Sequence, residues 1–123
     1  MKENSKIEFR KPIWNALSEF YLDTELQNSD YDRITEILIA SNFDINKLKA
    51  IDLLEVFPVL KENLLTPAGV WNGFDKDWLY KNCKYYYKKR NRLLFQVKIK
   101  IYNILFGWMR KKHWAEIEIR MKT

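Results

Sequence analysis

The sequence predicts an all-α fold, a compact bundle of four or five helices that ends in a long basic C-terminal helix. Apolar residues recur at spacings of three and four along most of the 123-residue chain. Only three glycines and three prolines interrupt this pattern, and 47% of the residues are hydrophobic, enough to build a core. We therefore expect a single helical domain over residues 11–123, preceded by a flexible N-terminus at residues 1–10.

Three helices are predicted in the first half of the chain. The first covers residues 11–22 and places Pro12 in its first turn, where the missing N–H costs nothing. The second covers residues 31–40. The third begins after a capping Asp44 and ends or kinks near Pro58, because a proline pushes the residue before it away from α geometry. One or two further helical turns are expected after this point, to about Leu65.

The segment PAGVWNGFDKDW (67–78) is predicted to be a rigid corner between the two halves of the chain. The proline and glycines suit turns, the first aspartate suits an N-cap, and the tryptophans are expected to be buried. We interpret the segment as structural. The residues that carry this interpretation are Pro67, Gly69, Trp71, Gly73, Asp75 and Trp78.

The rest of the chain is predicted to continue as one helix until a break near Gly107. Residues 95–122 also contain stretches in which polar and apolar residues alternate, which is the period of a β-strand. A C-terminal β-hairpin, and with it an α+β fold, stays open as the alternative.

Three blocks of the sequence resemble the DUF7079 family, a bacterial family described as a domain of unknown function. The blocks are WNALSEFYLDTEL (14–26), EVFPVLKENLL (55–65) and AGVWNGFDKDWL (68–79). The basic residues after about position 80 lie outside them. The resemblance implies one compact bacterial domain, and it brings no established activity, cofactor or partner.

Charge is divided unequally along the chain. Residues 1–74 hold 8 Lys/Arg and 12 Asp/Glu, while residues 75–123 hold 14 and 4, so balances of −4 and +10 give the net charge of +6. This asymmetry favours a non-enzymatic protein-interaction module whose basic C-terminal surface binds an acidic protein partner. The candidate interaction residues are Lys81, Lys84, Tyr85, Lys88, Lys89, Arg90 and Arg92.

Nucleic-acid binding through the helix at 81–92 is the alternative function. Tyrosines interleaved with Lys and Arg are typical of surfaces that bind a single strand. A homodimer through Ile101, Leu105 and Trp108 is also compatible with the sequence.

Residues that could carry out catalysis are few. The single histidine, His113, and the single cysteine, Cys83, are thirty positions apart, so we predict no metal site and no cofactor. His113 is expected at the surface because its neighbours are basic. The weak catalytic candidates are the carboxylates Glu55, Asp23 and Glu25.

Glu55 stands among apolar neighbours, which allows two interpretations. It could be a general base with a raised pKa, which would make the protein a carboxylate-based enzyme, our second alternative. It could instead have a structural role, bonded to the turn at 67–73 or paired with Arg10 or Lys11. We favour the structural role, and a protein without enzymatic activity.

The sequence predicts a cytoplasmic protein. A single cysteine cannot form an internal disulfide, and no apolar run approaches the roughly 18 residues of a membrane span. The basic N-terminus is not followed by the apolar segment of a secretory signal. We expect no transmembrane segment, and peripheral contact with a membrane is disfavoured.

Overall fold

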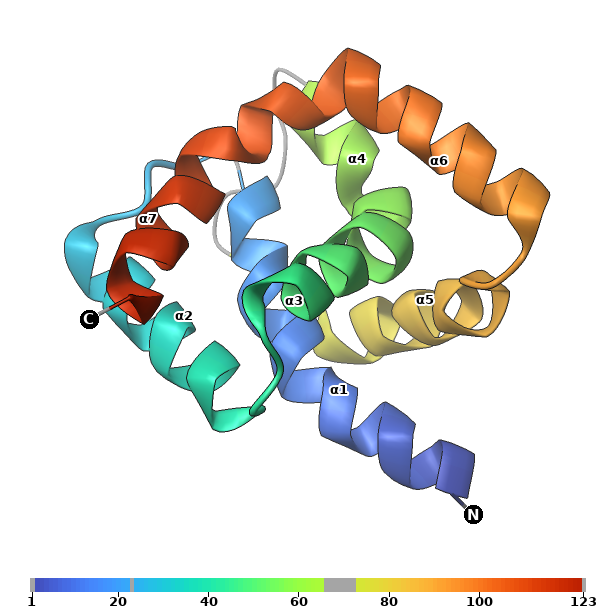
Figure 1. Ribbon diagram of the computed structural model, residues 1–123, viewed down its shortest axis with the longest axis horizontal. Coiled ribbons are helices and arrows are strands. Elements are labelled where there is room, and N and C mark those ends of the chain that lie inside the picture. The colour runs from blue at the N-terminus through green and yellow to red at the C-terminus, as the bar shows by residue number, and fades with distance from the viewer. Residues whose placement is uncertain (1, 23, 66–72, 123) are drawn as a thin grey trace.

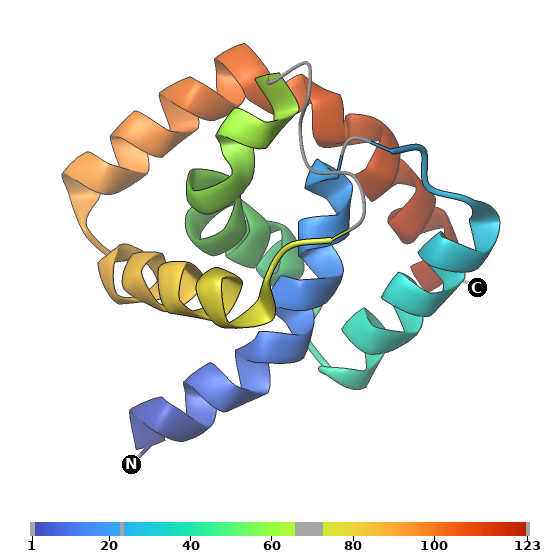
Figure 2. The same ribbon diagram turned by 180° about the vertical axis from the view of Figure 1, so that it is seen from behind.

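Every regular element in residues 2–22, 24–65 and 73–122, the part of the chain that the computed structural model describes, is a helix (Figures 1 and 2). The predicted all-α class is confirmed. The elements are α1 (Lys2–Ser18), η1 (Glu19–Tyr21), α2 (Asn28–Ala40), α3 (Ile45–Ile51), η2 (Asp52–Val56), α4 (Phe57–Leu65), α5 (Lys76–Lys89), α6 (Leu93–Phe106), η3 (Gly107–Arg110) and α7 (Lys111–Met121).

The short π-helical element η2 lies at the centre of the fold. It joins α3 to α4 without a break and also contacts α1, α5 and α6. Figure 1 shows the bent α3–η2–α4 segment surrounded by the other helices, with α6 and α7 forming an arch over it and α7 packed beside α2. The core around this segment includes the fully buried side chains of Trp14, Leu17, Leu38, Phe57 and Leu79.

The N-terminal segment differs from the prediction. Helix α1 begins at Lys2, whereas the sequence suggested a flexible stretch at residues 1–10 and a helix start near residue 11. Residues 3–6 are exposed, but Ile7 and Arg10 are both buried, so α1 packs against the rest of the protein from Ile7 onward. Pro12 consequently lies in the interior of the helix and not in its first turn.

The central segment begins as predicted, bends where it passes into α4 (Figure 1) and ends at Leu65, in agreement with the kink near Pro58 and the further turns expected from the sequence. The Asp44 carboxylate accepts a hydrogen bond from the Lys47 backbone N–H at 2.8 Å and caps α3. A proline ring normally clashes with the carbonyl four residues earlier. Here the wider π-helical turn at 52–56 immediately precedes α4, and helical structure continues through Pro58 in a new direction (Figure 1). This same turn places two acidic residues in the core.

The predicted long basic helix is wrong, because the chain turns after α5 and again at η3. The first turn, at residues 90–92, contains no glycine or proline. It is held by hydrogen bonds from the Arg92 N–H to the Lys89 carbonyl and from Gln96 Nε2 to the Arg90 carbonyl. The second turn confirms the break expected near Gly107.

The β-hairpin alternative is also wrong, because α6 and α7 contain the residues on which it depended. A strand-like alternation in the sequence is here compatible with helix because both helices expose part of their apolar surface. Among the described helices, none combines the length and the apolarity that crossing a membrane requires.

Candidate functional site

Two carboxylates, Asp52 and Glu55, lie on η2 in the centre of the protein, and each is only 1% exposed. A buried charge without partners would cost several kcal/mol, more than a buried ion pair contributes in net stability. Both carboxylates therefore need donors from surrounding helices, and the structure provides a similar set for each.

Glu55 is bound by two side chains of α1. Its Oε1 accepts hydrogen bonds from Arg10 Nε at 3.1 Å and from Trp14 Nε1 at 2.9 Å. Burial raises the pKa of Glu55, while Arg10 and Trp14 act against that rise. The structure thus contains the pairing with Arg10, one of the structural arrangements proposed from the sequence.

Asp52 accepts hydrogen bonds from one residue in the N-terminal part of the chain and from two in the C-terminal part. The Tyr21 hydroxyl donates to Oδ1, while Arg110 Nη1 and Trp114 Nε1 donate to Oδ2 at 2.9 and 3.0 Å. Burial, reinforced by the Asp52 carboxylate, holds the pKa of Tyr21 well above its usual value, so this phenol remains a donor. The sequence analysis did not select Asp52 or its partners.

A repeated sequence motif accounts for both sets of donors. RKPIW (10–14) and RKKHW (110–114) share the pattern R-K-x-x-W. Residues four apart lie on the same face of a helix, so the arginine and the tryptophan reach one carboxylate together. We call each set a carboxylate clamp: Arg10 and Trp14 on Glu55, and Arg110 and Trp114 on Asp52. This repetition was a detectable signal that the sequence analysis overlooked.

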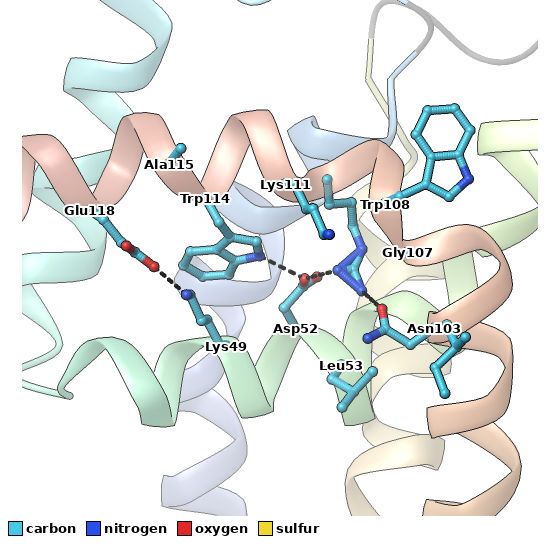
Figure 3. A pocket seen from close by; sticks show the side chains of 12 residues that line it. Lys49, Asp52, Leu53, Asn103, Gly107, Trp108, Lys111, Trp114, Ala115 and Glu118 are labelled. Atoms are coloured by element: carbon cyan, nitrogen blue, oxygen red, sulfur yellow. Dashed lines mark hydrogen bonds and ion pairs between the residues drawn. The ribbon is translucent and has the colours of Figure 1, made fainter.

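A groove of about 690 Å³ opens beside the second clamp (Figure 3). Figure 3 shows Asp52 joined to Trp114, while Lys49 and Glu118 form an ion pair beside them. Since Asp52 already accepts three hydrogen bonds, its carboxylate is occupied by the protein itself. The groove is lined by Lys49, Asp52, Leu53, Asn103, Ile104, Gly107, Trp108, Arg110, Lys111, Trp114, Ala115 and Glu118.

The basic residues predicted to bind a partner do not all face solvent. Lys81, Lys84, Tyr85, Lys88 and Arg92 are exposed, whereas Lys89 and Arg90 are half-buried.

The tyrosines of the same segment are mostly covered. Tyr86 is half-buried and stacks on Phe95, and Tyr87 is buried. Tyr85 is exposed but is covered on one side by Lys89, whose Nζ lies 4.2 Å from the ring centroid. This arrangement offers little of the stacking surface on which the nucleic-acid hypothesis depended.

Helix α6 presents a large apolar surface to solvent. Leu94 is 85% exposed and Ile104 is 79% exposed. We define the α6 face as these two residues, the exposed apolar residues that share their side of the helix, and Trp108 of the following η3. Its members are Leu93, Leu94, Val97, Ile101, Ile104, Leu105 and Trp108. It contains the three residues that the sequence analysis proposed for a homodimer. Lys98 and Lys100 are exposed and fall at its two edges by helical spacing.

The predicted corner is described only in part. Pro67, Gly69 and Trp71 lie outside the described residues. Gly73 has φ of 124°, which L-amino acids other than glycine rarely adopt.

The Asp75 carboxylate accepts a hydrogen bond from the Trp78 N–H at 2.9 Å, so it caps α5 as expected. The expected burial of Trp78 is wrong, because this side chain stacks on Phe74 at the surface and is 46% exposed.

The remaining catalytic candidates are not gathered into one site. Glu25 is exposed, and Asp23 lies outside the described residues. His113, expected at the surface, is instead half-buried: its ring stacks on Phe20 at 5.1 Å, and Nδ1 lies 2.8 Å from the Tyr31 hydroxyl. Burial lowers the pKa of His113, and the nearby Lys112 and Arg110 lower it further.

Metal-ligating side chains are likewise dispersed: in the described ranges, no group of three His, Cys, Asp or Glu residues could hold a metal ion.

The family model described as Domain of unknown function (DUF7079) matches residues 8–120. The chain belongs to the DUF7079 family. The match extends beyond the three blocks noted in the sequence and includes both carboxylate clamps and the whole α6 face of this DUF7079 domain. Neither the curated proteins nor the solved structures contain a match to the chain.

Proposed function

We propose that this DUF7079 protein is a protein-interaction module that binds an acidic partner through the α6 face. The observation that carries the proposal is the exposure of this face. Contiguous apolar patches on soluble proteins commonly mark interaction sites. Residues such as Leu94, Ile101 and Ile104 recur at helical spacing, so they offer one continuous surface and not scattered exposed side chains.

The charges around the α6 face favour an acidic partner. Lys98 and Lys100 border it, and Lys111 lies exposed just beyond its C-terminal end. A partner with an apolar patch bordered by Asp or Glu would be attracted by these lysines and would bury the apolar residues. Two copies of this chain would bring the same lysines together, and each copy carries a net charge of +6. The partner is therefore a different, acidic protein.

The other candidate functions receive less support from the geometry. Glu55 is buried beneath Arg10 and Trp14, where a substrate cannot reach its carboxylate without the clamp opening. Nucleic-acid binding would have to rely on lysines and arginines with little help from Tyr86 or Tyr87. It predicts retardation of DNA or RNA on a gel that weakens steeply with salt.

The proposal is tested with the wild-type protein and with Leu94→Glu and Ile104→Glu as separate baits in a lysate of the source cells. A protein that wild type retains is then purified, and its affinity is measured by isothermal titration calorimetry. We expect each substitution to weaken binding by about tenfold or more, because a carboxylate would be buried against an acidic partner. Both side chains are exposed, so the melting temperature should stay near that of wild type.

Ile119→Glu is the matched control, because Ile119 is an exposed apolar residue on α7, 63% exposed and outside the α6 face. It should bind the partner as wild type does. A Lys98→Glu/Lys100→Glu variant should bind more weakly and with a smaller dependence on salt. Unchanged affinity for the partner in both α6 variants would contradict the proposal. So would a wild-type homodimer, detected by sedimentation equilibrium, that the Ile104→Glu substitution dissociates.

A further inference from the structure

We propose that a second groove, between α1, the beginning of α3 and the end of α5, binds a small phosphorylated molecule that carries a planar ring. The groove has a volume of about 460 Å³. Its position is separate from the α6 face, so the proposal does not depend on the one above. The lining residues are Ser5, Lys6, Phe9, Arg10, Phe43, Lys47, Tyr87 and Arg90.

All the charged side chains that line this groove are positive. Lys6, Arg10, Lys47 and Arg90 contribute four cations, and no lining residue is acidic. Arg10 is compensated by Glu55, while none of the other three forms an ion pair with an acidic side chain in the described part of the chain. Such a concentration of positive charge suits a phosphate monoester, which carries a charge of about −1.5 to −2 at pH 7.

Arg10 supplies a preorganised donor at the inner wall of the groove. Its residue is only 5% exposed, and Glu55 fixes it through Nε. The guanidinium carbon lies 4.7 Å from the Tyr87 ring centroid and 5.8 Å from that of Phe43.

Within the described residues, Arg10 donates one hydrogen bond, from Nε to Glu55. Its two terminal nitrogens, Nη1 and Nη2, have no acceptor among these residues. These nitrogens form the planar fork that binds two oxygens of a phosphate. An ordered guanidinium with this fork unoccupied is the feature that assigns an oxyanion to the groove.

The aromatic residues indicate that the ligand extends beyond the phosphate. Phe9 lines the groove, is 48% exposed and meets the Phe43 ring edge-to-face at a centroid distance of 5.5 Å. The uncovered surface of Phe9 can stack with a planar ring, as aromatic side chains do with nucleobases. A nucleoside monophosphate combines the two required groups.

Isothermal titration calorimetry with inorganic phosphate, adenosine monophosphate and adenosine tests this assignment. We expect phosphate to bind, adenosine monophosphate to bind more tightly because its base adds a contact with Phe9, and adenosine to bind more weakly than either. Phe9→Ala should weaken the binding of adenosine monophosphate and leave the affinity for phosphate unchanged. Equal affinities for phosphate and adenosine monophosphate would overturn the assignment of a planar ring.

Charge-reversal variants locate the site while leaving Arg10 and Glu55 themselves in place. Lys47→Glu and Arg90→Glu should each weaken the affinity for phosphate and for adenosine monophosphate by about tenfold. Lys100→Glu, which makes the same change of charge on α6, should have no effect. An equal loss in Lys100→Glu would indicate non-specific attraction and overturn the proposal, as would the absence of saturable binding at low salt.

The same Lys100→Glu variant separates this proposal from the first. Because Lys100 lies on α6, this variant should weaken binding of the acidic partner and leave binding of phosphate unchanged. Lys47→Glu should weaken binding of phosphate and leave binding of the acidic partner unchanged. If both variants affected both ligands equally, the groove would not be a distinct site.

Discussion

Arg10 and Glu55 illustrate how single residues stabilise this protein. Their ion pair is buried, so each charge has lost its hydration and depends on the other. Trp14 is the third member of this buried group, because its indole N–H donates a hydrogen bond to Glu55. Removing one member leaves the others without partners in a region of low dielectric constant, which costs more than the pair itself contributes.

We predict that Glu55→Leu lowers the free energy of unfolding by about 3–5 kcal/mol, because it leaves the Arg10 guanidinium buried and unpaired. The double variant Arg10→Met/Glu55→Leu should recover part of this loss, since both charges are then gone. Urea denaturation followed by tryptophan fluorescence measures both values.

Glu8→Ala serves as the control for that experiment, because Glu8 forms an exposed ion pair with Lys11. Its effect should be much smaller than that of Glu55→Leu. If the double variant were as destabilised as the sum of Glu55→Leu and Arg10→Met measured separately, the two residues would not act as a pair.

At the scale of the element, the helix starts are determined by short-range interactions. Asp44 and Asp75 each accept a hydrogen bond from the backbone N–H three residues later. These interactions involve neighbours in sequence, and the sequence analysis identified both caps. The start of α1 differs, because Ile7 and Arg10 are held by residues distant in sequence, including Glu55.

Asp75→Ala should lower the free energy of unfolding by about 1 kcal/mol, because the first turn of α5 loses its cap. Asp77→Ala is a suitable control: Asp77 lies in the same turn and contributes only through the helix dipole, an effect of a few tenths of a kcal/mol at an exposed site. Chemical denaturation measures both. Equal losses in the two variants would show that charge, and not the capping hydrogen bond, stabilises this turn.

At the scale of the whole molecule, the two carboxylate clamps attach α1 and the η3–α7 segment to the same central turn, η2. Arg10 and Glu55 are 45 residues apart in sequence, and Arg110 and Asp52 are 58 apart. Helix α7 also packs along α2. Loss of the C-terminal segment would therefore affect the centre of the molecule and not only its surface.

We predict that a chain ending at Phe106 has no cooperative thermal transition by circular dichroism, because Asp52 loses Arg110 and Trp114 together. A chain without residues 3–5 should still melt cooperatively, since these three residues are exposed and both clamps remain. Cooperative melting of the chain that ends at Phe106 would show that the second clamp is not required for folding.

The all-α class, the caps of α3 and α5, the break near Gly107 and the family could all be recognised from the amino-acid sequence. These features depend on periodicity, on neighbouring residues or on whole sequence blocks, so they can be recognised along the chain. The turn at 90–92 carries no glycine or proline, and its hydrogen bonds include one from the Gln96 side chain. Tertiary structure was needed to locate it.

Which charges are buried and which apolar residues are exposed depends on how the helices pack against one another. Glu55 was a recognisable candidate, but Asp52 resembled an ordinary surface residue until Tyr21, Arg110 and Trp114 were seen around it. The groove lined by Phe9 and Lys47 and the exposed α6 face likewise depend on how distant helices meet. Periodicity predicts that a helix has an apolar side, whereas the packing of the other helices decides whether that side is covered.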